Sequence, residues 1–208
     1  MDDPHGRLLR PRKSLIPGGQ TVPSGIPQFN LPTTRQCPLQ TIRLLNLTHE
    51  RLHLLQSGPD RFCIQNGIQI GENVSILLDV VAQTTKLMTA VGGDPQWFGY
   101  LAIEEATETI VGTCAFKGPP GESRTVEIAY FTFPQFEGRG IGTAMAAALI
   151  RIASTSPEVE VIIAHTLPEN NASTSILRKS GMTFAGEVMD PEDGRVWRWT
   201  LPVASVKQ

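Results

Sequence analysis

Residues 125–145, TVEIAYFTFPQFEGRGIGTAM, join a strand-like run to a glycine-rich turn and then to an alanine-rich segment. The run 125–133 is rich in β-branched and aromatic residues, which favours a strand, and Pro134 is expected to end it. The segment 141–155 is a strong helix former. Three glycines alternate directly in front of this helix: Gly138, Gly140 and Gly142. A nearly bare backbone leading into a helix N-terminus is typical of an anion-binding site.

The glycines would let a phosphate group approach the main chain, and Arg139 and Thr143 would add a cation and a hydroxyl donor. The alternative is that the glycines only make a tight turn or a close helix–strand contact. The dinucleotide fingerprint G-x-G-x-x-G does not fit, because Thr143 stands where its third glycine should be. The Gly-Lys-Ser/Thr ending of a P-loop is also missing.

The rest of the chain alternates between strand-like and helix-like segments. Strands are predicted at 41–47, 97–105, 108–118, 125–133, 159–167, 182–188 and 195–201. Helices are predicted at 49–56, 75–91, 141–155 and 171–181, with loops at 58–74 and 118–124. This order predicts an α/β layer structure with a mixed sheet.

Composition limits the class of protein. The 208 residues carry a formal net charge of −2, so we expect no nucleic-acid or membrane partner, and the absence of a signal-like apolar run favours a cytoplasmic location. Three widely spaced cysteines suggest neither a disulfide framework nor a metal site. Residues 1–40 are rich in proline and glycine and carry a basic cluster, so we expect a flexible N-terminal tail before a domain at 41–204.

Two motifs resemble those of the GNAT superfamily of acyl-CoA N-acyltransferases. E-G-R-G-I-G (137–142) is similar to its Gln/Arg-x-x-Gly-x-Gly/Ala signature, with Glu137 replacing the usual Gln or Arg. P-E-N-N-A-S-T-S-I-L-R-K-S-G-M (168–182) resembles its second motif, P-E-N-x-x-S-x-x-x-L-x-K-x-G-F. The chain looks closest to the branch that acetylates ribosomal-protein N-termini and related amines. The resemblance implies a GNAT-type fold with a mixed central sheet of about six to seven strands flanked by helices.

The resemblance also implies where acetyl-CoA, the expected co-substrate, would bind. The strands 125–133 and 159–167 would splay apart around the pantetheine arm, with Asn170 on the pantetheine and Ser173 near the sulfur as a proton donor to the leaving thiolate. Backbone groups of Phe131, Thr132 and Phe133 would face the arm, and one N–H would polarise the thioester carbonyl. The diphosphate would lie on these residues: Glu137, Gly138, Arg139, Gly140, Ile141, Gly142 and Thr143. Leu177 occupies the position where other branches carry a catalytic tyrosine.

The implied reaction is direct attack of a primary amine, on a small molecule or a protein N-terminus, on acetyl-CoA. The amine must lose a proton, and by resemblance Glu127 is the general base, directly or through water. The alternatives are His165, at a strand end, as the base, and Glu127 as a partner in a structural ion pair or as a substrate-binding carboxylate. A catalytically silent CoA-binding module and an NAD-binding oxidoreductase remain as alternatives.

The C-terminal hairpin suggests two further features. It offers a free sheet edge for a homodimer. Trp197 and Trp199 alternate on one of its strands, so both should face the core or an interface.

Overall fold

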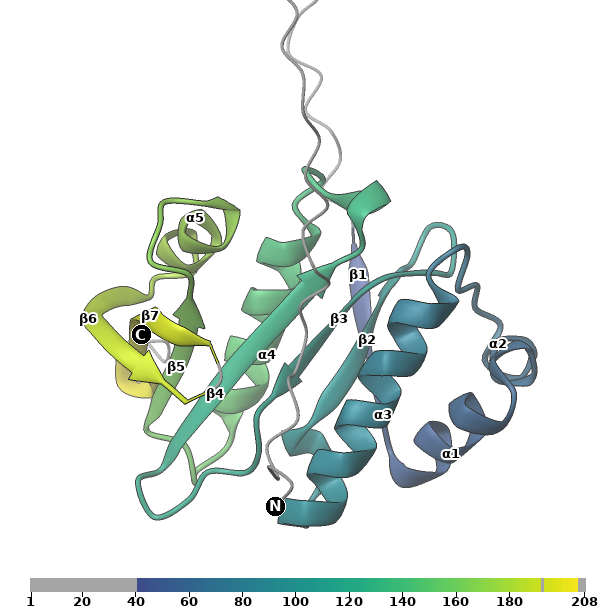
Figure 1. Ribbon diagram of the computed structural model, residues 1–208, viewed down its shortest axis with the longest axis horizontal. Helices are drawn as coiled ribbons and strands as arrows, with labels where there is room; N and C mark the ends of the chain where they lie inside the picture. The colour runs from purple at the N-terminus through teal and green to yellow at the C-terminus, as the bar shows by residue number, and fades with distance from the viewer. Residues whose placement is uncertain (1–40, 192, 206–208) are drawn as a thin grey trace, which may run out of the picture.

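The computed structural model describes residues 41–191 and 193–205 of the chain (Figure 1). The predicted tail, residues 1–40, lies outside the described residues. Its boundary with the domain therefore stays a prediction.

A single mixed sheet of seven strands forms the centre of the fold, in the order β1-β2-β3-β4-β5-β7-β6. The strands are β1 (Ile42–Asn46), β2 (Gly99–Glu104), β3 (Thr109–Phe116), β4 (Thr125–Thr132), β5 (Val161–Thr166), β6 (Thr183–Asp190) and β7 (Gly194–Pro202). Neighbouring strands are antiparallel except β4 and β5, which run parallel. The predicted α/β class, strand number and mixed sheet are confirmed.

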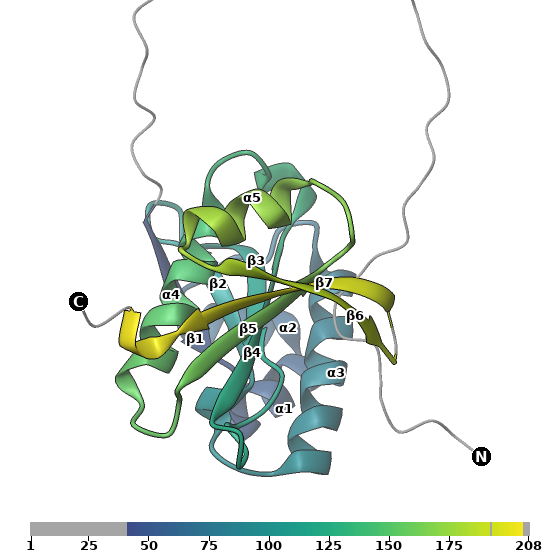
Figure 2. The ribbon, with the colours of Figure 1, turned by 90° about the vertical axis from the view of Figure 1, so that its left-hand side faces the viewer.

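Five helices lie on the two faces of this sheet. They are α1 (His49–Ser57), α2 (Pro59–Asn66), α3 (Val74–Val91), α4 (Ile141–Thr155) and α5 (Ala172–Lys179). Three short 3-10 turns, η1 (Pro95–Trp97), η2 (Pro134–Phe136) and η3 (Val203–Ser205), complete the described elements. Figure 2 shows α4 on one side of the sheet and α1, α2 and α3 on the other. As a parallel crossover between β4 and β5, α4 brings its N-terminus to the end of the sheet where β4 finishes.

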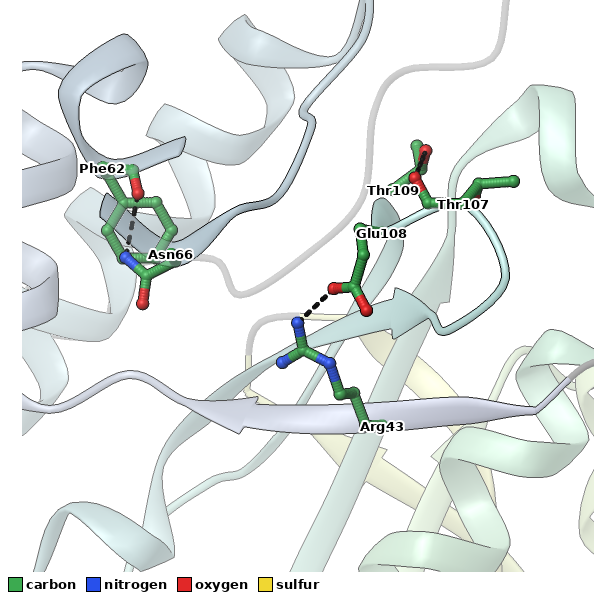
Figure 3. Close-up of polar contacts among 6 residues, drawn as sticks. All are labelled: Arg43, Phe62, Asn66, Thr107, Glu108 and Thr109. Carbon is green, nitrogen blue, oxygen red and sulfur yellow. Dashed lines mark hydrogen bonds and ion pairs between the residues drawn. The ribbon is translucent and has the colours of Figure 1, made fainter. Parts of the chain in front are cut away.

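The structure differs from the prediction at 58–74, where helix α2 replaces a loop. Pro59 opens the helix and Gly67, with φ of 63°, ends it in the left-handed region. Its last turn is tightened by the Asn66 side chain, which donates to the Phe62 carbonyl at 2.8 Å (Figure 3). The helix buries only Phe62, so an apolar repeat does not reveal it. Residues 97–98 were likewise expected in a strand, but Trp97 belongs to the 3-10 turn η1.

The β2–β3 hairpin, predicted from its sequence, is fastened to the sheet edge by an ion pair. Arg43 of β1 reaches Glu108 in the hairpin turn (Figure 3). Glu108 has a φ of 51°, which fixes the turn geometry. The pair joins β1 to the turn directly before β3.

The core lies on both faces of the sheet. Helix α3 contributes a buried stripe that includes Leu77, Val81 and Met88, and Trp199 of β7 is 1% exposed. The predicted core position of Trp199 is confirmed, and the partly buried Trp197 packs against the same core. By length and composition α3 alone among the described helices is apolar enough to cross a membrane, a test that core helices of globular proteins also pass.

Strands β3 and β4 approach each other very closely at Gly112. A Cβ built there would lie 2.5 Å from the Phe131 carbonyl oxygen. Because that oxygen is backbone, it cannot move without separating the two strands.

We therefore expect Gly112→Ala to lower the free energy of unfolding by about 1–3 kcal/mol through overpacking. Gly121→Ala is the matched control, since a Cβ there has open space around it. Urea unfolding should show the Gly121 variant within about 0.5 kcal/mol of the parent. Equal midpoints for the two variants would contradict the prediction.

Candidate active site

Strands β4 and β5 separate after only three residue pairs. The ladder joins Thr125 to Val161, Val126 to Ile162 and Glu127 to Ile163, and it ends there. On its other side β4 stays paired with β3 as far as Thr132. The predicted splaying of these two strands is confirmed, and Glu127 lies at the point where they part.

Backbone alternation decides which amides of β4 face the gap. Lys117 N–H donates to the Glu127 carbonyl at 2.9 Å, and Phe133 N–H donates to the Val111 carbonyl at 3.0 Å. Because bonded positions alternate along an antiparallel pair, odd-numbered residues of β4 bond to β3. This corrects the expectation for Phe131 and Phe133, whose main-chain groups are engaged in the β3 ladder. The main-chain groups of Tyr130 and Thr132 point to the gap instead.

The N-terminus of α4 has the geometry expected of an anion site. The first helical hydrogen bond runs from Ala144 N–H to the Gly140 carbonyl at 3.0 Å, and no side chain caps the helix. The amides of 141–143 therefore precede the ladder. Gly138 and Gly140 have φ of 74° and 80°, and nothing lies within 4 Å of a Cβ built on either. Residues 137–140 are exposed, so this end of the helix fits a diphosphate.

Gly142 has a different role from the other two glycines. It is buried, and a Cβ there would lie 2.8 Å from Cδ1 of Ile176 in α5. Close packing of helix α4 against helix α5 is the contact at this glycine, where the alternative expected a helix–strand contact.

Arg139 is held by the protein rather than left free in the cradle. Its Nη2 lies 2.7 Å from Oε1 of Glu104, a β2 residue that is 4% exposed. The guanidinium also lies over the Phe136 ring, 5.3 Å from its centroid. The Glu104 carboxylate thus already offsets the positive charge of Arg139 that was expected to bind the phosphates. Sequence reasoning missed this partner.

The second motif divides into structural and candidate functional residues. Asn171 and Thr174 form a capping box at the start of α5. Asn170 lies just outside and accepts from Arg178 at 3.1 Å. Ser173, in the first turn, accepts a bond at 3.3 Å through its carbonyl from the hydroxyl of Tyr130. Burial raises the pKa of Tyr130, so this phenol is protonated at neutral pH.

Tyr130 is a residue that sequence reasoning read only as part of a strand. Leu177, the position of the tyrosine in other branches, is buried in the core. Tyr130 nevertheless brings a phenol to the N-terminus of α5 from β4. A long-range contact of this kind leaves no local signal.

Glu127 is surrounded by two nitrogen groups. Its Oε1 lies 2.6 Å from Lys117 Nζ and 3.0 Å from His165 Nδ1. Burial by itself raises the pKa of Glu127, but the bonds and charges of His165 and Lys117 outweigh it and hold that pKa below its ordinary value. An ionised carboxylate only accepts, so the proton of this bond is on Nδ1 of His165, and in the neutral imidazole Nε2 is then the acceptor.

An open cleft of about 340 Å³ adjoins this cluster. Glu127 and Ile163, the last pair of the β4–β5 ladder, both line it, together with Gly118, Pro119 and Ser123 of the loop between β3 and β4. The lining residues are Lys117, Gly118, Pro119, Ser123, Thr125, Glu127, Ile163 and Arg198. Across the described part of the chain no group of three or more His, Cys, Asp or Glu is placed to hold a metal ion.

The Arg139–Glu104 pair allows a structural role to be separated from a ligand role. Arg139→Gln should lower the free energy of unfolding by about 2–3 kcal/mol, because it leaves a buried carboxylate unpaired. Adding Glu104→Gln should restore most of this loss. If the double variant is as unstable as Arg139→Gln, the broken Arg139–Glu104 pair is not the cause of the lost stability.

The environment of Glu127 predicts an acid-dependent stability difference. A lowered folded-state pKa stabilises the fold above the ordinary value of 4.5, and that contribution is lost as the pH falls through the folded-state value. The melting temperature of Glu127→Gln should therefore lie below that of the parent at neutral pH, and the two should converge below pH 4.5. Glu187→Gln, which breaks an exposed pair with Arg195, should differ little at any pH. A more stable Glu127→Gln at pH 7 would contradict this.

The family model for the Acetyltransferase (GNAT) domain matches residues 74–183. No curated protein matches significantly.

Many solved structures share the fold. RimL, a ribosomal alpha-N-protein acetyltransferase in complex with coenzyme A, is 15% identical, with 79% of this chain and 96% of that one covered and a TM-score of 0.55. An aminoglycoside acetyltransferase in complex with coenzyme A is 18% identical over 80% and 98% of the two chains, with a TM-score of 0.56. The spermidine/spermine N-acetyltransferase SpeG from Vibrio cholerae is 13% identical over 80% and 95%, with a TM-score of 0.54. The family match covers more than half of the sequence, and the chain belongs to the GNAT family of acetyltransferases.

Proposed function

We propose that the protein transfers the acetyl group of acetyl-CoA to a primary amine, on a small molecule or a protein N-terminus, by direct attack of the amine. One observation carries this proposal. The β4–β5 ladder ends at Glu127 and Ile163, and the same two residues line an open cleft. A thioester entering between the separated strands and an amine entering from the cleft would meet at Glu127.

The donor would be held mainly by backbone groups. The amides at the N-terminus of α4 and the turn through Gly138 and Gly140 suit the diphosphate. The unpaired main-chain groups of Tyr130 and Thr132 suit the pantetheine arm, and one of their N–H groups would polarise the thioester carbonyl. Asn170 is proposed as a further contact of the arm. The Glu137 side chain is exposed and need not contact the ligand for these backbone contacts to form.

His165 is proposed as the proton acceptor beside Glu127, which lines the cleft and holds the His165 ring through Nδ1. A carboxylate whose pKa is held low is a weak base toward an ammonium group. The bond between Glu127 and Nδ1 of His165 instead leaves Nε2 as the acceptor of the neutral imidazole ring. In this scheme the amine nitrogen attacks the carbonyl carbon, its proton passes to His165 directly or through water, and the C–S bond breaks.

The leaving thiolate needs a proton from the other side. Ser173 is proposed as the donor, because it lies in the first turn of α5. The bond from the hydroxyl of the partly buried Tyr130 to the Ser173 carbonyl connects that turn to β4. Tyr130, protonated at neutral pH, is proposed as a second hydroxyl at this turn.

The names of the structural relatives support an amine as acceptor without choosing one. They include acetyltransferases of a ribosomal protein, an aminoglycoside and spermidine or spermine. A catalytically silent module that binds CoA remains the alternative, whereas an NAD-dependent oxidoreductase loses its support with the family match.

Location and assembly stay predictions. A cytoplasmic enzyme without membrane or nucleic-acid partners agrees with the small net charge. A homodimer agrees with the outer strand β6, where Phe184 is 53% and Met189 is 73% exposed.

Release of free thiol from acetyl-CoA, measured with a panel of amines and of peptides with free N-termini, tests the proposal. Turnover with at least one amine is expected. His165→Gln and Glu127→Gln should each reduce kcat by about 10²–10⁴-fold, the contribution typical of a general base. Acetyl-CoA affinity measured by calorimetry should stay the same.

His53→Gln, on the exposed face of α1, is the control and should match the parent. Acetyl-CoA binding without any thiol release would favour the silent module. Binding of NAD but not of CoA would overturn the proposal altogether.

A further inference from the structure

Among the described residues, Arg198 is the charged side chain of the cleft lining for which no ion pair is found. It lies on β7, and its Nε is buried without a hydrogen-bond partner among the described residues. The ion pairs found across 41–191 and 193–205 all involve other arginines, Lys117 or His165. A buried guanidinium nitrogen ordinarily meets an acceptor, and an acceptor carried by a ligand in the cleft would satisfy Nε of Arg198.

Sheet register places Arg198 beside the proposed catalytic pair. Arg198 of β7 is directly opposite His165 of β5. Directly opposed side chains lie on the same face of a sheet, with Cβ atoms about 5 Å apart. His165 contacts Glu127 on that face, and both Glu127 and Arg198 line the cleft. A ligand group bound to Arg198 would therefore lie close to the reacting amine.

The charge balance of the cleft favours an acceptor that carries an anion. Lys117 and Arg198 supply two cations, and Glu127 supplies one carboxylate that Lys117 already engages. A simple ammonium ion entering this cleft would meet net positive charge. An amine with a nearby oxyanion would instead offset the Arg198 charge while its nitrogen lies near His165.

We infer that Arg198 binds an oxyanion carried by the acceptor, and that the acceptor is a small amino-acid-like amine whose carboxylate lies close to its amino group. The inference rests on the proposed function and narrows its acceptor class. The guanidinium fork matches a carboxylate or a phosphate in two parallel hydrogen bonds. A cleft of about 340 Å³ is at the small end of ligand sites, which suits a compact acceptor.

The kinetic test uses L-amino acids, each with its carboxamide and its decarboxylated amine, and compares phosphoethanolamine with ethanolamine. The parent should prefer the anionic member in kcat/KM by roughly 10- to 100-fold, the factor that a hydrogen bond to a charged group contributes. Arg198→Gln should reduce the preference to about 2-fold or less, and Arg198→Lys should retain part of it. The phosphoethanolamine pair shows whether a phosphate can replace the carboxylate.

Two controls make the result specific. Arg195 lies on the same strand, but its side chain is 69% exposed and paired with Glu187. Arg195→Gln should therefore keep the parental preference. Acetyl-CoA affinity should be the same in all variants. Loss of acetyl-CoA binding in Arg198→Gln would assign the arginine to the donor and overturn the inference.

A binding arm separates this inference from the proposed function. N-acetyl amino acids and their carboxamides are titrated into the CoA-bound protein, which requires no turnover. The free acids should bind to the parent at least 10-fold more tightly than their carboxamides do. The acids and the carboxamides should bind equally well to Arg198→Gln. This result without any turnover would uphold the Arg198 site and refute the catalytic proposal. Turnover with equal rates for acid and amide, or turnover of peptides alone, would uphold catalysis and refute the inference.

Discussion

The fold of this protein depends on one interruption in its hydrogen bonding, the early end of the β4–β5 ladder. Three residue pairs hold the parallel strands together, and beyond Glu127 the two strands turn to different partners, β3 and β7. An unpaired strand edge inside a sheet is costly unless another group bonds to it. The same separation exposes the main chain of Tyr130 and Thr132 and sets α4 and α5 on either side of the gap. It also leaves an open cleft at the point where the two strands part.

The charges around that point follow from the same geometry. Glu127, half-enclosed where the strands part, would be costly to bury as an isolated ion, and Lys117 and His165 stabilise its ionised form. His165 in turn has its ring fixed through Nδ1. Arg139, at the far end of the gap, is matched by the buried Glu104 in a comparable way. Arg198 differs from both, because no carboxylate of residues 41–191 or 193–205 pairs with it.

Much of the candidate site was readable from the sequence because it lies in two short motifs. The turn 137–142 and the segment 168–182 identified the helix ends that border the gap, and the two left-handed glycines agree with the bare backbone expected there. The packing partner of Gly142 and the ion-pair partner of Arg139 were not predicted, since Ile176 and Glu104 are distant in sequence. The W-R-W alternation did contain a signal for Arg198. Two tryptophans directed to the core place the arginine between them on the opposite face.

The sequence by itself determined the alternation of strands and helices, the positions of the turns and the family motifs, because these depend on local propensity and on spacing along the chain. Helix α2 was not predicted from the sequence, because a helix that buries only Phe62 has no apolar period. Only the tertiary structure decided which residues meet: His165 with Glu127, Tyr130 with Ser173 and Arg139 with Glu104. The physical reason is that strand pairing and side-chain contact join residues far apart in the chain, and no local pattern records their partners.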